Sequence, residues 1–220
     1  MVFWLFLIIA FPFVFLLLPT KIYGKKYLKI VKKKATIFCS NHQTGNDAVL
    51  LKARICPNAK VIAKKSLFKN KFFGWFLKQF GAYPVDRGGN DIQAIKTTLK
   101  TLKENKQILM FPEGTRIKNA ESVEVKNGLV LFALKTDAFI VPAFFRKITR
   151  PLVFNKLLIG KPFKLSEYDE FKDAKTDKET LNKASKILEE KLEYLKNITL
   201  KDYKNEYKLF KKELKNKGVV

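Results

Sequence analysis

The side chains best suited to chemistry in this chain are His42 and Asp47, which stand five positions apart in the run SNHQTGND. His42 is the only histidine among 220 residues. Imidazole is the side chain whose ordinary pKa suits proton transfer near neutral pH, and a nearby carboxylate fixes its tautomer and stabilises its charged form. The pair therefore predicts a general base with an orienting partner; a lone polar residue in a loop is the simpler alternative.

Two further segments place charged side chains after predicted strands. GAYPVDRGG contains Arg87, and FPEGTR contains Glu113 and Arg116. A planar guanidinium group matches two phosphate oxygens at once, so both arginines are candidates for a phosphate site, and Glu113 is a candidate for binding a substrate hydroxyl. Considered singly, each has a simpler interpretation: Arg87 in an ion pair with Asp86, Glu113 as a cap and Arg116 as a surface charge.

Rigid elements must bring these segments together. Positions five apart in one continuous helix point about 140° apart, so we expect His42 to precede a helix and Asp47 to lie in its first turn, with Gly45 and Asn46 forming the turn. Short apolar runs alternate with helical patterns along the chain. This alternation predicts an α/β domain with a mixed, mostly parallel central sheet flanked by helices. Such folds usually bind ligands at the strand ends.

The expected elements follow from these patterns. Pro142, inside a strand-like run, predicts a bulge or an edge strand. The helix over 67–80 is unusually aromatic, which fits either a core face or a wall that meets lipid or an acyl chain. The predicted strands are 35–39, 59–63, 82–85, 107–111, 138–145 and 153–159, and the predicted helices between them are 46–55, 67–80, 91–104 and 127–136.

The N-terminal segment predicts membrane attachment. Residues 1–20 carry no charge, and about 20 apolar residues suffice to span a bilayer. Neither the basic start nor the cleavage site of a signal peptide is present. Pro12 leaves an interfacial helix as an alternative to an uncleaved hydrophobic membrane helix. Residues 21–34 contain seven lysines and no acid, which predicts anionic membrane lipids as partners and a catalytic domain on the cytoplasmic face of the cell membrane; a solvated linker is the alternative.

We therefore divide the chain into three parts. Residues 1–34 form the membrane anchor with its basic juxtamembrane segment, and residues 35–165 form the catalytic domain. Residues 166–220 form a C-terminal region, in which 180–198 has the apolar spacing of an amphipathic helix. A Lys-rich tail follows from 201 and is expected to be a frayed surface helix.

Composition narrows the classes of function. The net charge of +24 predicts an anionic partner, which leaves nucleic acid, anionic lipid and phosphorylated substrates open. Nucleotide-binding loops of the GxGxxG or GxxxxGK[ST] type are absent. Cys39 and Cys56 have no zinc-like spacing, so we expect free thiols and no metal site. Cys39 as a nucleophile is conceivable, but a half-buried strand residue is the favoured interpretation.

The order and spacing of four motifs resemble the glycerolipid acyltransferase family, above all its bacterial 1-acyl-glycerol-3-phosphate acyltransferases. The motifs are HxxxxD, GAYPVDR, FPEGTR and the later VP, with AKKSL, KNG and IGKP in support. The resemblance covers roughly residues 30–165 and implies His42 as general base and Asp47 as its orienting partner. It further implies substrate binding by a set comprising Lys65, Arg87, Glu113, Gly114, Thr115 and Arg116.

The activity implied by this resemblance is transfer of an acyl group from a thioester to the free hydroxyl of lysophosphatidic acid, giving phosphatidic acid. The acyl donor would be acyl-CoA or acyl carrier protein, acting as cosubstrate, and no cofactor is expected. A same-family enzyme acting on glycerol 3-phosphate or another lysolipid remains the near alternative. A basic nucleic-acid-binding module and a catalytically silent membrane scaffold are the remote ones, and we expect no nucleic acid as partner.

Overall fold

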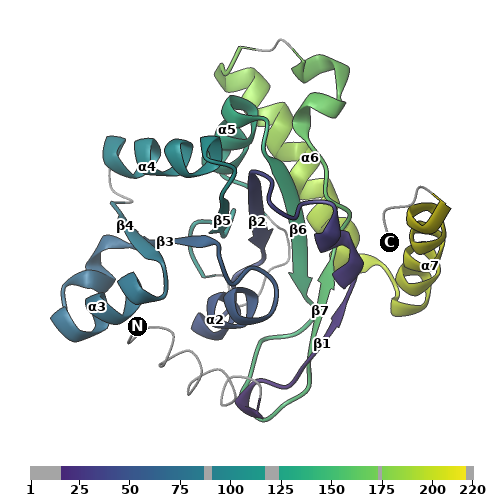
Figure 1. Ribbon diagram of the computed structural model, residues 1–220, viewed down its shortest axis with the longest axis horizontal. Coiled ribbons are helices and arrows are strands. Elements are labelled where there is room, and N and C mark those ends of the chain that lie inside the picture. Colours follow the sequence, from purple (N-terminus) through teal and green to yellow (C-terminus); the bar gives the residue numbers. More distant parts are fainter. Residues whose placement is uncertain (1–15, 87–90, 117–123, 173–174, 217–220) are drawn as a thin grey trace.

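One seven-stranded sheet organises the computed structural model, which describes residues 16–86, 91–116, 124–172 and 175–216 (Figure 1). Its order is β1-β7-β6-β2-β5-β3-β4. Neighbouring strands are parallel except β6 and β7, which are antiparallel. The strands are β1 (Thr20–Tyr23), β2 (Thr36–Ser40), β3 (Lys60–Lys64), β4 (Ala82–Val85), β5 (Gln107–Met110), β6 (Phe139–Phe145) and β7 (Asn155–Ile159). The predicted α/β class with a mixed, mostly parallel sheet is confirmed.

Helices cover both faces of this sheet. The connections from β2 to β3 and from β3 to β4 step one way along it, and those from β4 to β5 and from β5 to β6 step back. Because crossovers between parallel strands are right-handed, α2 and α3 cover one face, and α4 and α5 cover the other, where α6 packs against α5 and β6. The helices are α2 (Gly45–Arg54), α3 (Lys71–Gln79), α4 (Ile92–Lys103), α5 (Asn127–Thr136), α6 (Lys178–Asn197) and α7 (Leu200–Asn216), with 3₁₀ turns η1 (Lys25–Lys29), η2 (Lys65–Phe68), η3 (Leu165–Glu167) and η4 (Asp169–Phe171).

The centre of the sheet is the core of the domain. Every residue of β2 is buried, and so are six of the seven residues of β6. Ile37, Ile108 and Ile140 sit side by side on β2, β5 and β6 with no exposed surface. Strands buried on both faces need apolar residues at nearly every position. This explains why short continuous apolar runs predicted them to within one or two residues.

Pro142 lies in an interior strand, so the expectation of an edge strand there is wrong. On one side, β6 pairs in parallel with β2. On the other, the Ala143–Ile159 pair is followed by a bridge between Ile140 and Phe163. Three steps along β6 therefore oppose four steps along the neighbouring segment, which is the extra residue of a bulge. The missing N–H of Pro142 falls at this irregularity, where a regular ladder would have required it.

The aromatic helix α3 is divided between the two roles expected for it. Leu77 and the C-cap residue Phe80 are partly buried and pack against the core, as does Phe68 in the preceding turn η2. Phe72 is 79% exposed, and Trp75 is 45% exposed. Phe76, which is partly buried, stacks on Phe80 with ring centroids 6.3 Å apart. One side of α3 thus belongs to the core, and its other side presents aromatic rings to the surroundings.

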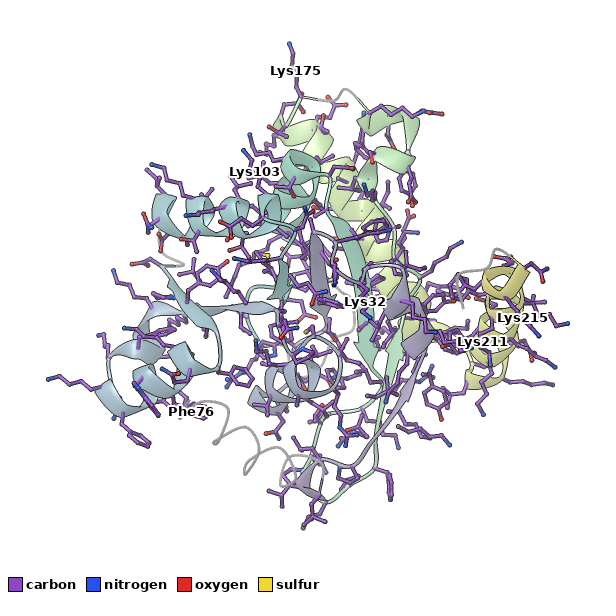
Figure 2. The ribbon with its side chains drawn as sticks, in the orientation of Figure 1. Lys32, Phe76, Lys103, Lys175, Lys211 and Lys215 are labelled. Atoms are coloured by element: carbon purple, nitrogen blue, oxygen red, sulfur yellow. The ribbon has the colours of Figure 1, made fainter. Side chains whose placement is uncertain are left out.

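Two parts of the chain outside residues 35–165 contribute to the same body. Residues 20–34 supply the edge strand β1 and the turn η1, where Tyr27 and Val31 are buried. The C-terminal tail, expected to be a frayed surface helix, instead forms α7, whose Tyr203 and Phe210 are buried. The rings of Tyr27 and Phe210 lie 4.3 Å apart. Lysine side chains project from different sides of the molecule: Lys175 lies at one margin, and Lys215, on α7, lies at another (Figure 2).

The predicted N-terminal membrane helix falls largely on residues 1–15, which lie outside the described residues. Within the described ranges, no helix has both the length and the apolar character required to cross a membrane. Leu16 and Leu17, the first described residues, are 70% and 44% exposed.

Candidate active site

The position of His42 is fixed from the strand that precedes it. Asn41, at the end of β2, has no exposed surface. Its side-chain amide donates to the carbonyl oxygen of Phe145 at 3.1 Å, and its side-chain oxygen accepts from the backbone N–H of Phe145 at 2.8 Å. This two-way bond joins the carboxyl end of β2 to that of β6. The residue after Asn41 therefore starts from a rigid point.

Asp47 caps the helix that follows and faces His42. Thr44 is the N-cap of α2 and forms a capping box with Asp47. The Oδ2 atom of Asp47 accepts from the backbone N–H groups of Gln43 at 2.7 Å and Thr44 at 2.6 Å. The same oxygen lies 3.4 Å from Nδ1 of His42. The expected arrangement, with His42 before the helix and Asp47 in its first turn, is the one observed.

The environment of Asp47 keeps it charged. The residue has no exposed surface. Burial alone would raise its pKa, but the nearby side chains of His42 and Thr149 and the backbone N–H groups of Thr44 and Gln43 together outweigh burial and lower the pKa below its ordinary value. A buried, charged carboxylate at this position faces Nδ1 of His42 at 3.4 Å, where it is placed to orient the ring.

The ring of His42 is held between this carboxylate and an aromatic face. It stacks on the ring of Phe111 with centroids 3.8 Å apart and an interplanar angle of 17°. The side chain is 12% exposed. Because Nδ1 faces Asp47, Nε2 is the nitrogen left to meet a hydroxyl group. This geometry is the one required of a general base.

Glu113 joins the site through the backbone. Its Oε2 atom accepts from the N–H of His42 at 3.2 Å, and the residue is only 3% exposed. Burial, reinforced by the nearby charge of Asp47 and opposed by the hydrogen bond from His42, raises the pKa of Glu113 to about 7. Its Oε1 atom is buried and has no hydrogen-bond partner among the described residues. A substrate hydroxyl is a suitable partner for that oxygen.

The loop after Glu113 brings one cationic side chain, Arg116, to the N-terminus of α2, while a second, Lys126, contacts the loop at Gly114. Gly114 has φ +70°, a conformation that favours glycine, and a Cβ there would lie 3.2 Å from Cδ of Lys126. Thr115 and Arg116 are exposed. A Cβ at Gly45 would lie 3.4 Å from Nη2 of Arg116, so this guanidinium group lies over the first turn of α2. Arg116 and the positive end of the helix dipole together favour a bound anion.

Of the remaining predicted site residues, only Lys65 is among those that the structure describes. Lys65, in η2, approaches Asp86 at 3.7 Å with both side chains largely exposed. Arg87 lies outside the described residues. The structure therefore brings together His42, Asp47, Glu113, Gly114 and Arg116, with Thr115 between the last two. Their roles in catalysis and binding stay predictions.

Three residues with positions in the site were not assigned to it from the sequence. Asn41 precedes His42, and only the fold reveals that its partner is Phe145. Phe111 and Lys126 belong to motifs already noted, FPEGTR and KNG, but the stacking of Phe111 on His42 and the approach of Lys126 to Gly114 required coordinates.

Cys39 is a strand residue, as the favoured interpretation predicted, but it is fully and not half buried. It is 1% exposed, and burial raises the pKa of its thiol far above the ordinary value. A thiol in this state is not a nucleophile. Among the residues that the structure describes, no group of three or more His, Cys, Asp or Glu side chains could hold a metal ion.

Comparison with known proteins now assigns the class. The model of the family described as acyltransferase matches residues 20–146, which is more than half of the chain. The chain therefore belongs to the acyltransferase family. The match includes the edge strand β1 and reaches the end of β6, so it contains every predicted site residue.

Individual relatives of the chain have names that specify an activity more closely than the family does. The 1-acyl-sn-glycerol-3-phosphate acyltransferase of Bacillus subtilis is 34% identical over 184 residues, covering 80% of this chain and 90% of that protein. Its namesake from Streptococcus pneumoniae is 31% identical over 147 residues, covering 62% of this chain and 53% of that protein. The solved structure of the 1-acyl-sn-glycerophosphate acyltransferase PlsC from Thermotoga maritima has a TM-score of 0.63 over 90% of this chain and 79% of that chain. At 20% identity, this last likeness supports the fold alone.

Proposed function

We propose that this protein transfers an acyl group from a thioester to the free hydroxyl of 1-acyl-glycerol 3-phosphate, giving phosphatidic acid. The names of its relatives from Bacillus subtilis and Streptococcus pneumoniae support this acceptor. The observation that carries the proposal is the convergence of His42, Asp47, Glu113 and Arg116 at the carboxyl ends of β2 and β5. A base, its orienting carboxylate, a hydroxyl-binding group and an anion-binding group are the parts that this reaction needs.

His42 activates the acceptor. An alcohol is a weak nucleophile until its proton is removed, and general base catalysis contributes about 10²–10⁴-fold. Nε2 of His42 takes the hydroxyl proton as the oxygen attacks the thioester carbonyl. Asp47, 3.4 Å from Nδ1, stabilises the imidazolium that results. The hydroxyl is held near His42 by Glu113, whose Oε1 atom has no other hydrogen-bond partner among the described residues.

The tetrahedral intermediate then collapses and expels the thiol. The carbon–sulfur bond breaks, and the proton held by His42 returns to the departing thiolate. No acyl-enzyme is formed in this scheme, in keeping with the inert thiol of Cys39. One well-placed donor to the oxyanion contributes about 3–4 kcal/mol. Backbone N–H groups near Gly45 or Gly114 are the donors we propose.

Arg116 binds the phosphate of the acceptor in this proposal. Its guanidinium lies over Gly45 at the N-terminus of α2, where the helix dipole also favours a negative group. Lys65 and Arg87 are proposed to complete the phosphate site from the ends of β3 and β4. Thr115 and Gly114 are proposed to line the acceptor site beside Glu113.

The donor in this proposal is acyl-CoA or acyl carrier protein, and no cofactor takes part. The uncharged segment 1–20 and the seven lysines of 21–34 support attachment to the cell membrane, with the catalytic domain on its cytoplasmic face. We assign the net charge of +24 to anionic lipid surfaces rather than to nucleic acid.

Purified full-length protein, incubated with a labelled acyl thioester and a panel of acceptors, tests the proposal. The panel contains lysophosphatidic acid, glycerol 3-phosphate and a neutral lysolipid. We expect labelled phosphatidic acid as the main product from the wild type and none above background from His42→Ala. Lys212→Ala, which removes an exposed charge on α7, is the control and should match the wild type. Normal turnover by His42→Ala would rule out the proposed base, and preference for glycerol 3-phosphate would change the acceptor.

A further inference from the structure

The turn between β6 and β7 exposes three consecutive large apolar side chains. Leu152 is 74% exposed, Val153 52% and Phe154 80%. Single exposed apolar residues are ordinary on a protein surface, but a contiguous group usually marks a contact site. We call residues 152–154 the apolar tip.

Hydrogen bonds of the buried side chain of Asn155 fix the conformation of the tip. Asn155 is only 3% exposed. Its side-chain oxygen accepts from the N–H of Arg150 at 3.2 Å, while its amide donates to the carbonyls of Val153 at 2.9 Å and Pro19 at 3.3 Å. Leu152 has φ +58°, which is unfavourable for a residue with a side chain. A buried amide network thus imposes a strained turn that points apolar groups outward.

The tip continues an apolar surface that begins at the N-terminal segment. The N–H of Leu152 donates to the carbonyl of Leu17 at 2.6 Å. Leu16 and Leu17 are themselves 70% and 44% exposed. They follow directly on fifteen residues without any charge. The exposed apolar surface therefore includes two separate parts of the chain.

The tip also lies at the end of the sheet that carries the candidate active site. β7 is antiparallel to β6, so the turn before it stands at the carboxyl end of β6, beside the start of β1 (Figure 1). The side-chain amide of Asn46, in the first turn of α2, approaches the carbonyl of Thr149 at 3.4 Å. The turn that bears the tip thus touches the helix that presents Asp47.

The charges around the tip all have one sign. Residues 146–164 contain six Lys or Arg and no acid, and the first acidic residue of the whole chain is Asp47. Arg150, two positions before Leu152, is exposed. A partner that complements this surface is apolar inside and negative at its boundary. An anionic bilayer has this structure.

We propose that the apolar tip inserts into the boundary between headgroups and acyl chains of an anionic bilayer. This contact rests on the proposed membrane location of the enzyme and deepens it, because it adds a second attachment beside residues 1–20. Contacts from the tip and from Leu16 and Leu17, which adjoin it at the active-site end, set the orientation of the body. They turn the site toward the surface from which a lipid acceptor arrives.

The insertion is tested with a polarity-sensitive fluorophore on the full-length protein, reconstituted in vesicles of phosphatidylcholine with phosphatidylglycerol. The probe is attached at Phe154→Cys and, as a control, at Leu209→Cys, since Leu209 on α7 is also well exposed, at 61%. Cys39 and Cys56 are 1% and 0% exposed, so labelling is selective. We expect a blue-shifted emission and quenching by a lipid-borne quencher at position 154 only. Equal behaviour at the two positions would overturn the proposal, and so would a shift that depends on protein concentration and not on lipid.

A kinetic test separates the tip from the chemistry. Leu152→Ser combined with Phe154→Ser should raise the apparent KM for acceptor presented in vesicles by about tenfold, because apolar insertion is lost. Activity on a short-chain, water-soluble acceptor should be unchanged, and Leu209→Ser should change neither. Equal losses on both acceptors would contradict a docking role. If the wild type transfers no acyl group, the proposed function fails, while the fluorescence still reports on insertion.

Discussion

Replacing Glu113 with glutamine should stabilise the protein in a pH-dependent way. Glu113 is 3% exposed, and its Oε2 atom accepts one hydrogen bond, from the N–H of His42 at 3.2 Å. The amide oxygen of glutamine can accept the same bond. The substitution therefore removes the cost of burying a charge and leaves the hydrogen bond and the side-chain volume nearly unchanged.

The magnitude follows from the raised pKa. In the folded protein the pKa of Glu113 is about 7, against 4.5 for an ordinary glutamate. Between these values the folded state binds more protons than the unfolded state, so the free energy of unfolding falls as pH rises through this window and is level above it. The free energy of unfolding is lower by about 3 kcal/mol once Glu113 is ionised in both the folded and the unfolded state. Glutamine does not titrate and avoids this loss.

Urea unfolding of the detergent-solubilised protein, followed by circular dichroism, measures the effect. At about pH 5 the free energies of unfolding of wild type and Glu113→Gln should be close, and at about pH 8 the variant should exceed the wild type by up to about 3 kcal/mol. Glu190→Gln, the same change at an exposed position of α6, is the control and should show no such pH dependence. The variant should also transfer acyl groups more slowly, because the group proposed to hold the acceptor hydroxyl has changed. A stability difference that is equal at both pH values would refute the reasoning.

Two other substitutions test the roles proposed within the site. Asp47→Asn should lower kcat by up to about 10⁴-fold, because a neutral amide no longer stabilises the imidazolium that forms when His42 takes the hydroxyl proton. Its fold should survive, since the amide oxygen can still accept from Gln43 and Thr44; stopped acyl transfer with an unchanged circular dichroism spectrum is the expected result, and near-normal kcat would contradict the orienting role. Arg116→Ala should raise the KM for the phosphate-bearing acceptor far more than the KM for the thioester. Initial-rate kinetics with each substrate varied in turn decide this, and equal increases would remove Arg116 from the phosphate site.

Local sequence patterns predicted the interior of the fold well. β2, β5 and β6 are buried on both faces, so unbroken apolar runs mark them, and α5 matches its predicted range of 127–136. The placement of His42 before α2 and of Asp47 in its first turn followed from helix geometry and turn residues. Such features depend on neighbours in the chain, which a sequence displays directly.

Features that depend on distant partners were missed for a physical reason. Asn41 and Phe145 are 104 positions apart, and no pattern in either neighbourhood indicates their two-way bond. The edge strand β1 has no fully buried residue and adjoins a Lys-rich stretch, so its sequence resembles a linker. The tail forms a docked α7 because Tyr27 and Phe210 meet, a contact that composition cannot show. For Pro142 the sequence left a bulge and an edge strand open, and only the partner segment, with its extra residue between Ile159 and Phe163, decides for the bulge.

Asp47 has two roles, as a helix cap and as the partner of His42, so the activity of the enzyme depends on the first turn of α2. The carboxylate that caps α2 at Thr44 is the same carboxylate that faces His42. If that turn frays, the cap bonds and the alignment of the imidazole are lost in one event. His42 can then no longer act as the proposed base, although the central sheet remains folded. On warming, acyl transfer should therefore be lost at temperatures at which most of the molecule is still folded. The heat sensitivity of the reaction would be set by a few residues at the mouth of the site and not by the core.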